Sequence, residues 1–584
     1  MNTYRRIREI LAPAERKGAW VLLALMFVGM AVETIGIGVI VPVIALLTDG
    51  GIPERYPQLQ PLIRFLGNPT QAQLVTRGVL ALSGVYLVKA LYLAFLGWQL
   101  NKYVADVRVQ LSQRLFATYL RQPYTFHLQR NSAQLLRNVS GEVGIFGALL
   151  TQSLTLTAEI MVVLGVAALL LAVEPVGAII VGLVLGTASV SFYYATRASI
   201  TRWGVARQHH EGLRIQHLQQ GLGGAKDVKL LGRERDFLTQ HEVHHVQSAR
   251  VGLLQAVLGS LPRLWLELLA VFGLSILVLT MVAQGRETAS IVPTLGLFAV
   301  AAFRLMPSVN RVLSAVQYVR FTRPVINTLY DEIKSLAPEA ARATSGPLEF
   351  RTEIHLDDVS FAYPGAAGRA LNNVTLTIRR GESVGFIGPT GSGKSTLVDV
   401  VLGLLPPNGG RVIVDGQDIQ ENLRAWQDQI GYVSQSIYLT DDTIRRNVAF
   451  GLAHDEIDDA AVQRAVEAAQ LDEFLATLPK GLETVVGERG IRLSGGQRQR
   501  IGIARALYHD PSVLVLDEAT SALDIATERE VMKAFLTLRG DKTILIVAHR
   551  LSTVEHCDRL YKLVGGSVAE EGTPGELLRV PKVG

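Results

Sequence analysis

Six long apolar runs fill residues 19–311 of this 584-residue chain, and no such run follows them. At 1.5 Å per residue, a helix of about 20 residues crosses the roughly 30 Å hydrocarbon core of a bilayer. Each run reaches that length, so the sequence predicts a domain of six membrane-spanning helices. The predicted spans lie near residues 19–47, 78–100, 145–173, 176–197, 261–284 and 289–311.

The connections between the runs predict the orientation of the spans. Spans three and four meet at Glu174-Pro175, and spans five and six meet at residues 285–288; both connections are short and carry little positive charge. Segments 101–144 and 198–260 are long, polar and rich in Lys and Arg, which is typical of the cytoplasmic side. We therefore expect a multi-pass membrane protein, with its basic N-terminus inside and its spanning helices continuing into the cytosol.

Composition narrows the function classes. The net charge of +5 comes from basic residues in the polar stretches between apolar runs, a pattern of membrane topology rather than of nucleic-acid binding. The single cysteine, Cys557, excludes an intramolecular disulfide and a thiolate zinc cluster. Residues 19–47 form too long an apolar run for a signal peptide, so we expect a retained span. The His-rich stretch 241–245, with His209-His210, is interpreted as solvated helix surface rather than a metal site.

The composition changes after Pro324. We predict a membrane domain over residues 1–324, a polar linker over 325–348 and a nucleotide-binding domain over 349–584. In the last part, strand-like runs alternate with helical patterns, which predicts an α/β fold. The clearest strand-like runs are residues 383–387, 411–414, 513–516 and 543–547.

A phosphate-binding loop is predicted between the apolar run 383–387 and a helix that starts at Lys394. Glycines let backbone N–H groups close around phosphates, Lys394 reaches the same oxygens, and the Ser395 hydroxyl can hold Mg²⁺. The loop therefore predicts a nucleoside triphosphate and Mg²⁺ as cofactors, and by itself it indicates only an NTPase. Its residues are Gly388, Pro389, Thr390, Gly391, Ser392, Gly393, Lys394 and Ser395, followed by Thr396.

Residues of the catalytic step are predicted at the ends of three other strands. Four apolar residues precede Asp517, which we expect to ligate Mg²⁺, and Glu518, which we expect to polarise the attacking water. Gln435 can reach both the metal ion and that water, and His549 can hydrogen-bond the γ-phosphate. Tyr363, ahead of the phosphate loop, offers a flat ring that stacks on adenine.

Together these residues resemble the nucleotide-binding domain of the ATP-binding-cassette (ABC) superfamily. The resemblance includes the signature Leu493-Ser-Gly-Gly-Gln497 and the D-loop Ser521-Ala-Leu-Asp524. It implies that the signature caps the γ-phosphate held by the phosphate loop of a second copy of the chain, so that a homodimer encloses two ATP. The signature residues that would do so are Ser494, Gly495, Gly496 and Gln497.

Six spans ahead of such a domain resemble the type IV, exporter-like architecture. The resemblance implies that the bends near residues 123–131 and 221–232 are coupling helices. A soluble ABC ATPase is excluded by the spans.

Four basic residues are predicted at membrane depth, where each costs about 2.5–3.5 kcal/mol. Lys89 lies about 17 Å into the second span, and Arg304 about 20 Å from the outer edge of the sixth. Arg311 is seven residues further on the same helix face, and Arg263 begins span five. Four positive groups facing one cavity suit an anionic head group.

A different interpretation of these charges stays open. Arg263 and Glu267 are four residues apart and can simply pair, and Arg304 can pair with Glu159 or Glu33. The lysine of span two can snorkel.

The membrane half resembles the PglK-type lipid-linked oligosaccharide flippases. The resemblance implies that Arg263, Arg304 and Arg311 handle the pyrophosphate of a polyprenyl-diphosphate-linked oligosaccharide; Lys89 stands where that family has arginine and loses the bidentate fork. It also implies an external helix near residues 52–66 that engages the polyprenyl tail, an ordinary loop being the alternative. The similar segments are residues 32–42, 261–263 and 303–311.

We therefore expect a homodimeric ABC flippase that moves a lipid-linked oligosaccharide, or another anionic lipid, outward through the inner membrane. One alternative is an exporter of another lipid or of drugs. A second is an ATP-gated channel or regulatory subunit, against which intact Glu518 and His549 argue.

Overall fold

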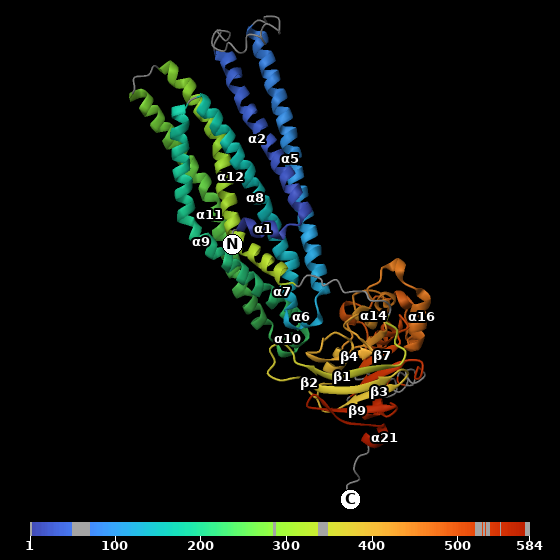
Figure 1. The fold of residues 1–584 in the computed structure, drawn as a ribbon. Helices are drawn as coiled ribbons and strands as arrows, with labels where there is room; N and C mark the ends of the chain where they lie inside the picture. The colour runs from blue at the N-terminus through green and yellow to red at the C-terminus, as the bar shows by residue number, and fades with distance from the viewer. Residues whose placement is uncertain are drawn as a thin grey trace. The chain divides into compact units, whose positions relative to one another are not determined.

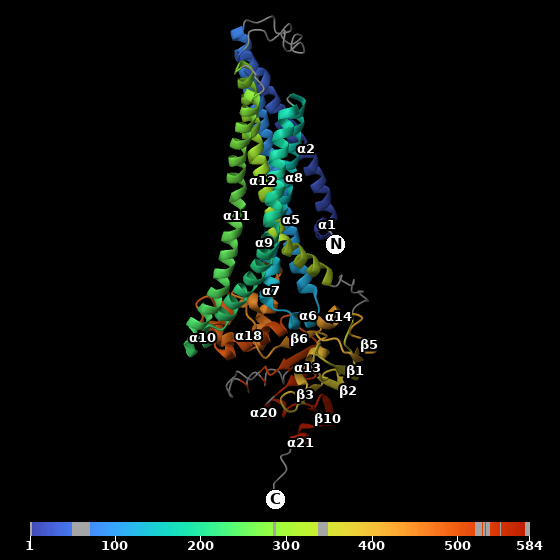
Figure 2. The same cartoon turned by 90° about the vertical axis from the view of Figure 1, so that its left-hand side faces the viewer.

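The computed structural model describes residues 3–48, 71–173, 175–283, 288–336, 348–519, 528, 532, 538–548 and 550–578. The chain forms two compact units, shown in Figures 1 and 2. The first contains Met1–Gln122 and Gln129–Pro338, and the second contains Pro123–Leu128 and Glu339–Gly584.

The first unit is helical, and each predicted span lies within one long helix, except that residue 284 of the fifth span is outside the described residues. The longest helices have 48 to 51 residues, or about 72–77 Å, far more than a bilayer requires. The prediction that spanning helices extend beyond the membrane therefore agrees with the structure. The six helices are α2 (Pro13–Thr48), α5 (Gln71–Arg121), α8 (Val143–Val173), α9 (Pro175–Gly223), α11 (Glu234–Ala283) and α12 (Thr288–Ser335).

Length and apolar composition alone qualify four helices, within the described residues, as candidate membrane spans. These are Pro13–Val39, Val75–Arg121, Ser132–Ala172 and Glu234–Gly273. Spans four and six also lie in long helices, but many side chains of α12 and several of α9 lie outside the described ones. The loop predicted as an external helix, residues 52–66, lies outside the described residues as well.

The long helices pack in pairs (Figures 1 and 2). α8 runs along α12, α9 along α11, and α2 along α5. α9 also approaches α12 closely at Gly204, where a Cβ would lie 2.2 Å from the carbonyl oxygen of Phe321. A residue without a side chain is therefore required at this crossing.

Short helices occupy the bends that the sequence predicted. α6 (Tyr124–Gln129) begins directly after Pro123, and α10 (Ala225–Leu231) begins after Gly224. α1 (Thr3–Ile10) precedes the first span, and α7 (Ser132–Leu136) leads through the π-helix η2 (Arg137–Glu142) into α8. Asn131 caps α7 by accepting a hydrogen bond from the N–H of Ala133 at 2.8 Å.

The expected linker, residues 325–348, differs from the structure in its first part. α12 continues to Ser335, and Val325, Ile326 and Leu329 are fully buried. The apolar spacing of these residues gives the helix a buried stripe, which is why the chain stays helical after Pro324. Residues 337–347 lie outside the described part.

The second unit contains two sheets. The larger has the order β10-β9-β3-β8-β7-β6, with β3, β6, β7, β8 and β9 parallel and β10 antiparallel. Its central strands are buried along their length, as parallel strands covered on both faces must be. The bounds are β3 (Ser383–Ile387), β6 (Ile430–Val433), β7 (Val513–Asp517), β8 (Thr543–Val547), β9 (Arg559–Val564) and β10 (Ser567–Gly572).

The smaller sheet is antiparallel, with the order β2-β1-β4-β5. Its strands are β1 (Glu353–Phe361), β2 (Leu371–Arg379), β4 (Gly409–Val414) and β5 (Gln417–Asp418). The described helices of this unit are α13 (Lys394–Val401), α14 (Leu423–Gln427), α15 (Ile444–Val448), α16 (Asp459–Ala468), α17 (Asp472–Thr477), α18 (Gly495–Leu507), α20 (Leu551–Val554) and α21 (Pro574–Leu577), with short 3₁₀ turns η3 (His454–Glu456), η4 (Gly481–Glu483) and η5 (Glu488–Gly490).

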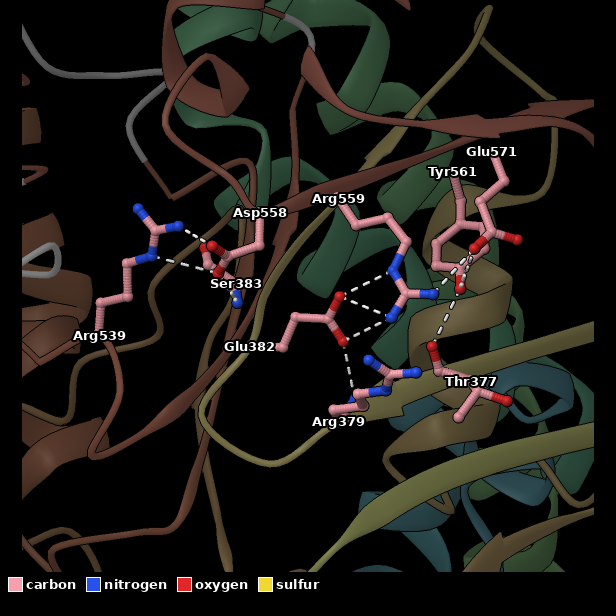
Figure 3. Close-up of polar contacts among 9 residues, drawn as sticks. All are labelled: Thr377, Arg379, Glu382, Ser383, Arg539, Asp558, Arg559, Tyr561 and Glu571. Atoms are coloured by element: carbon pink, nitrogen blue, oxygen red, sulfur yellow. Dashed lines mark hydrogen bonds and ion pairs between the residues drawn. The ribbon is translucent and has the colours of Figure 1, made fainter. Parts of the chain in front are cut away.

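An ion-pair cluster ties the strand ends of the second unit together (Figure 3). Arg559 donates to both carboxylate oxygens of Glu382, at 2.7 and 2.8 Å, and to Glu571 at 2.8 Å. Glu382 also accepts from the backbone N–H of Arg379 at 2.8 Å. The paired carboxylates raise the pKa of Arg559, against the opposing effect of its partial burial. The cluster thus joins the turn between β2 and β3 to β9 and β10.

Candidate functional site

The phosphate loop follows the buried strand β3 and leads into α13, as the sequence predicted. Gly388 has φ +147°, and a Cβ there would lie 2.2 Å from the carbonyl oxygen of Leu563. Gly393, the cap of α13, has φ +100°, and its Cβ would lie 2.7 Å from the oxygen of Ala370. These two positions require glycine, and they let the loop backbone curve tightly.

The start of α13 is built to hold an anion. No side chain caps the helix, so its first backbone N–H groups are available at the positive end of the helix dipole. The Ser392 hydroxyl is buried and makes no hydrogen bond among the described residues. Uncapped amides and a buried hydroxyl are what a phosphate group would satisfy, so the loop fits ATP.

The Lys394 ammonium lies across this loop. It donates to the carbonyl oxygens of Gly388 at 2.8 Å and Pro389 at 3.0 Å. Burial lowers its pKa, while the charges of Glu518 and Asp517 oppose that shift. The ammonium group therefore lies close to both the phosphate loop and the two carboxylates at the end of β7.

The predicted acidic residues lie at the end of β7. This strand is buried except at its last residue, Asp517. Glu518 follows with φ +51°, an uncommon backbone conformation for a residue other than glycine. Gln435, which follows β6, donates to the Glu518 carboxylate at 2.6 Å. The structure thus brings together the two residues proposed to act on the attacking water.

The oxygen ligands proposed for Mg²⁺ come from two neighbouring elements. Asp517 ends β7, and the exposed Ser395 lies in the first turn of α13. Carboxylate and hydroxyl oxygens suit a hard cation, and the Gln435 side chain adds an amide oxygen. The residues present therefore fit a magnesium ion.

Tyr363 lies beside α13. Its hydroxyl is 3.1 Å from the Thr396 hydroxyl, and its ring packs edge-on against Phe361 with centroids 5.1 Å apart. The ring is thus fixed next to the phosphate loop, as an adenine-stacking residue requires.

Two residues near this site were missed by sequence reasoning. Tyr124 of α6 belongs to the second unit, where burial raises its pKa and the nearby Asp399 and Tyr363 act in the same direction. Burial raises the pKa of Asp399, on α13, to about 6, with a further contribution from Asp517. An acidic residue within an otherwise apolar helix face was the available sequence signal for Asp399.

The signature folds as the start of a helix. Ser494 caps α18: its hydroxyl accepts from the Gln497 N–H at 3.2 Å, and the Gln497 side chain accepts from the Ser494 N–H at 2.8 Å. Gly495 and Gly496 form the first turn. This capping box places small residues and backbone amides at the surface of the helix end. His549 and the D-loop residues 521–524 lie outside the described residues.

Three of the four basic residues proposed for substrate contact a carboxylate. Lys89 lies 3.2 Å from Glu33, and both side chains are largely buried. Arg311 lies 2.5 Å from Glu159, with 43% of the arginine side chain exposed.

The other two basic residues are the third paired one, Arg263, and Arg304. Arg263 pairs with Glu267 four residues later, at 2.8 Å and on an exposed face. Arg304 lies in α12, but its side chain is outside the described ones.

Comparisons with known proteins agree with this division of the chain. A family model described as ABC transporter matches residues 371–521, and one described as ABC transporter transmembrane region matches residues 19–304. The ATP-dependent lipid A-core flippase of Cupriavidus metallidurans is 35% identical over 509 residues, which cover 85% of this chain and 84% of that protein. A protein of the same name from Alkalilimnicola ehrlichii is 31% identical over 586 residues, covering 99% and 94%.

A solved structure has the same fold. The ATP-bound structure of a bacterial Atm1-family ABC exporter superimposes with a TM-score of 0.78 at 23% identity, covering 97% of this chain and 96% of that one. The prediction of a helical membrane domain fused to an ABC-type α/β domain is therefore confirmed.

Proposed function

Because the chain belongs to the ABC transporter family, and so couples ATP hydrolysis to transport, we propose that it is a homodimeric flippase for a phosphorylated glycolipid in a bacterial inner membrane. The relatives named lipid A-core flippases support a lipid cargo. A polyprenyl-diphosphate-linked oligosaccharide, the cargo that the sequence suggested, shares a charged, phosphorylated head group with such lipids.

The contact between Gln435 and Glu518 is the observation that carries the catalytic part of this proposal. ATP, when bound, supplies the phosphoryl group whose transfer to water releases free energy. The uncapped start of α13 and Lys394 would hold its phosphates, and Asp517 with Ser395 would hold the magnesium ion. Glu518, oriented by the Gln435 amide at 2.6 Å, would accept a hydrogen bond from the attacking water and turn its oxygen toward the phosphate.

The proposed homodimer follows from the signature. Ser494 and Gln497 cap each other, which leaves the rest of the α18 N-terminus to face an anion. In the ABC family this anion is the γ-phosphate bound by the partner. One chain carries one phosphate loop and one signature, so two copies make two equivalent sites.

The cargo site is proposed at the paired charges of the membrane unit. A carboxylate partner lowers the cost of holding Arg311 or Lys89 away from water. A phosphate group that carries more negative charge than a carboxylate can take that partner's place on the arginine, which binds it in bidentate fashion. The protein can therefore keep its charges paired before and after the lipid binds.

Reconstitution of the full-length protein in proteoliposomes tests the proposal. Outward movement of a polyprenyl-diphosphate glycan and of a lipid A-core glycolipid is measured separately, with phosphatidylethanolamine as a lipid that lacks the phosphorylated glycan. ATP-dependent movement of either glycolipid is expected, and the arm that moves identifies the cargo. Movement of neither, with ATP hydrolysis intact, would reject the flippase proposal in favour of another exporter or a channel.

The Arg311→Gln variant tests the head-group contact. Losing one charge-assisted contact should lower the flipping rate about tenfold. Arg233→Gln, which removes an exposed ion pair with Asp236, is the matched control and should flip normally. Equal flipping by both variants would contradict the assignment of Arg311.

A further inference from the structure

The first unit contains an apolar pocket of about 540 Å³ between α8, α9 and α12. This volume lies within the range of small-molecule binding sites. The lining extends over residues 160–171 of α8, 178–189 of α9 and 305–313 of α12. Representative lining residues are Ile160, Leu164, Leu171, Ile179, Leu183 and Leu313.

The pocket offers almost no hydrogen bonding to an occupant. Ser189 is the one polar residue among the described residues that line it, and its hydroxyl already donates to the Leu185 carbonyl at 2.6 Å. The hydroxyl oxygen can still accept one hydrogen bond, but a single acceptor does not satisfy a water molecule or a polar ligand. A peptide segment would bring backbone groups that nothing in the lining satisfies. Only a hydrocarbon matches this lining.

Two glycines give the pocket its width. Gly182 and Gly186, four residues apart on α9, both line it, and a Cβ at either position would meet no atom within 4 Å. The open space beside these glycines is thus part of the pocket, and larger residues would fill it without a clash.

A charged pair marks one end of the pocket. Glu159 immediately precedes the lining residue Ile160, and Arg311 lies between the lining residues Val309 and Val312. From Ile160 to Leu171 the pocket follows α8 for about 16 Å, toward the outer end of that helix. The charges therefore lie at the cytoplasmic end and the hydrocarbon space extends outward from them.

We propose that this pocket binds one hydrocarbon chain of an anionic lipid whose head group contacts Arg311. This rests on the proposed function and specifies how the cargo is held. A lipid of the inner leaflet has its head group toward the cytosol and its chain toward the bilayer centre. That orientation matches the order of charge and apolar lining along α8, and the exposed part of Arg311 gives the head group access.

Photolabelling of the full-length protein in proteoliposomes tests this site. The probe is hexadecyl phosphate with a diazirine at the end of its chain, and labelled peptides are identified by mass spectrometry. Label is expected in residues 160–171 and 178–189. Gly186→Leu and Gly182→Leu should each lower that label about tenfold. Gly84→Leu and Gly97→Leu on α5, where a Cβ also meets no atom within 4 Å, are matched controls and should leave it unchanged.

Several outcomes would overturn the site. Label spread evenly over the lipid-facing helices would show only general contact with the bilayer. Unchanged label in the glycine variants would show that the pocket is not the site. If the leucine variants fail to fold, as monitored by size-exclusion chromatography, Gly186→Ala and Gly182→Ala narrow the same space by one methyl group and should give a smaller loss of label.

The photolabelling result is separable from the proposed function. Label in the pocket without glycolipid movement would keep the hydrocarbon site and reject the flippase. Glycolipid movement that Gly186→Leu does not slow, together with absent label, would keep the flippase and reject the site.

Discussion

The two units of this protein hold their charged residues in opposite ways. In the nucleotide-binding unit, charged and polar residues from separate strands converge on one place, as Gln435 does on Glu518 at 2.6 Å. In the membrane unit, the basic residues proposed for the cargo are spread over several helices, and Lys89, Arg263 and Arg311 each have a carboxylate of their own chain beside them. The first arrangement suits a ligand of fixed shape, because the polar groups that would bind it are already close together. The second keeps charges tolerable in a bilayer and leaves the ligand to exchange with a carboxylate.

Loss of the Glu518 carboxylate should have the largest effect. Glu518→Gln keeps the shape of the side chain but removes the base that orients water, so we expect ATP turnover to fall about 100- to 1000-fold while ATP binding persists. Steady-state hydrolysis and nucleotide binding are measured on the same preparation. Glu555→Gln, at an exposed glutamate outside every motif, is the control. Near-normal ATP turnover by the Glu518→Gln protein would contradict the catalytic role assigned to this carboxylate.

The buried ion pair between Lys89 and Glu33 tests the arrangement of charges in the membrane unit. Lys89→Met removes the ammonium 3.2 Å from Glu33, and we expect a loss of about 2–4 kcal/mol in stability because a carboxylate stays buried. Adding Glu33→Gln should recover most of that loss. Thermal unfolding in detergent measures both variants, with Lys229→Met at an exposed pair as the unaffected control. A stable single variant would show that this pair does not offset the cost of burial.

The ion-pair cluster in Figure 3 sharpens the comparison within the nucleotide-binding unit. Arg559→Met leaves Glu382 and Glu571 facing each other without the guanidinium, and we expect a loss of about 2 kcal/mol. Arg351→Met, at an exposed pair with Glu349, should change the unfolding temperature little. Equal effects of the two substitutions would show that the cluster adds nothing beyond a surface pair.

Substitution of Asp399 should give the smallest change in stability, and this change should depend on pH. Burial raises its pKa to about 6 in the folded protein, from an ordinary value of 3.8. Between these values the unfolded chain has already released the proton, so the folded state loses stability as the pH rises through this window and stays lower above it. We expect Asp399→Asn to be more stable at pH 7 by about 1–2 kcal/mol, after allowance for partial exposure of the group.

Thermal unfolding between pH 4 and pH 8 checks this sign. That advantage of the Asp399→Asn protein should shrink toward pH 4 and disappear at about pH 3, below both pKa values, where Asp399 is protonated in the folded and the unfolded state. Asp541→Asn, at an exposed aspartate, is the control. An advantage that does not depend on pH would assign the effect to packing instead of protonation.

Short-range patterns in the sequence account for much of the fold. The apolar runs predicted each long helix of the first unit because a run of that length has no other stable form in a bilayer. The strands around residues 383–387 and 513–516 were predicted from apolar runs next to loop residues, and both are present as β3 and β7. The bends at α6 and α10 were predicted from Pro123 and Gly221–Gly224, since proline and glycine interrupt helices locally.

Long-range packing decided the rest. No local pattern showed that α12 continues to Ser335, because its continuation depends on burying Val325, Ile326 and Leu329 against other helices. The proximity of Tyr124, Asp399 and Asp517 likewise joins three distant segments.

The sequence by itself thus determined the membrane helices, the α/β domain and the chemistry of the phosphate loop, because each depends on residues that are close along the chain. Only the tertiary structure decided that Gln435 meets Glu518, that Lys89 and Arg311 pair with Glu33 and Glu159, and that α8, α9 and α12 enclose an apolar pocket. These contacts depend on the register in which whole helices and strands pack against one another, and a one-dimensional pattern carries little information about that register.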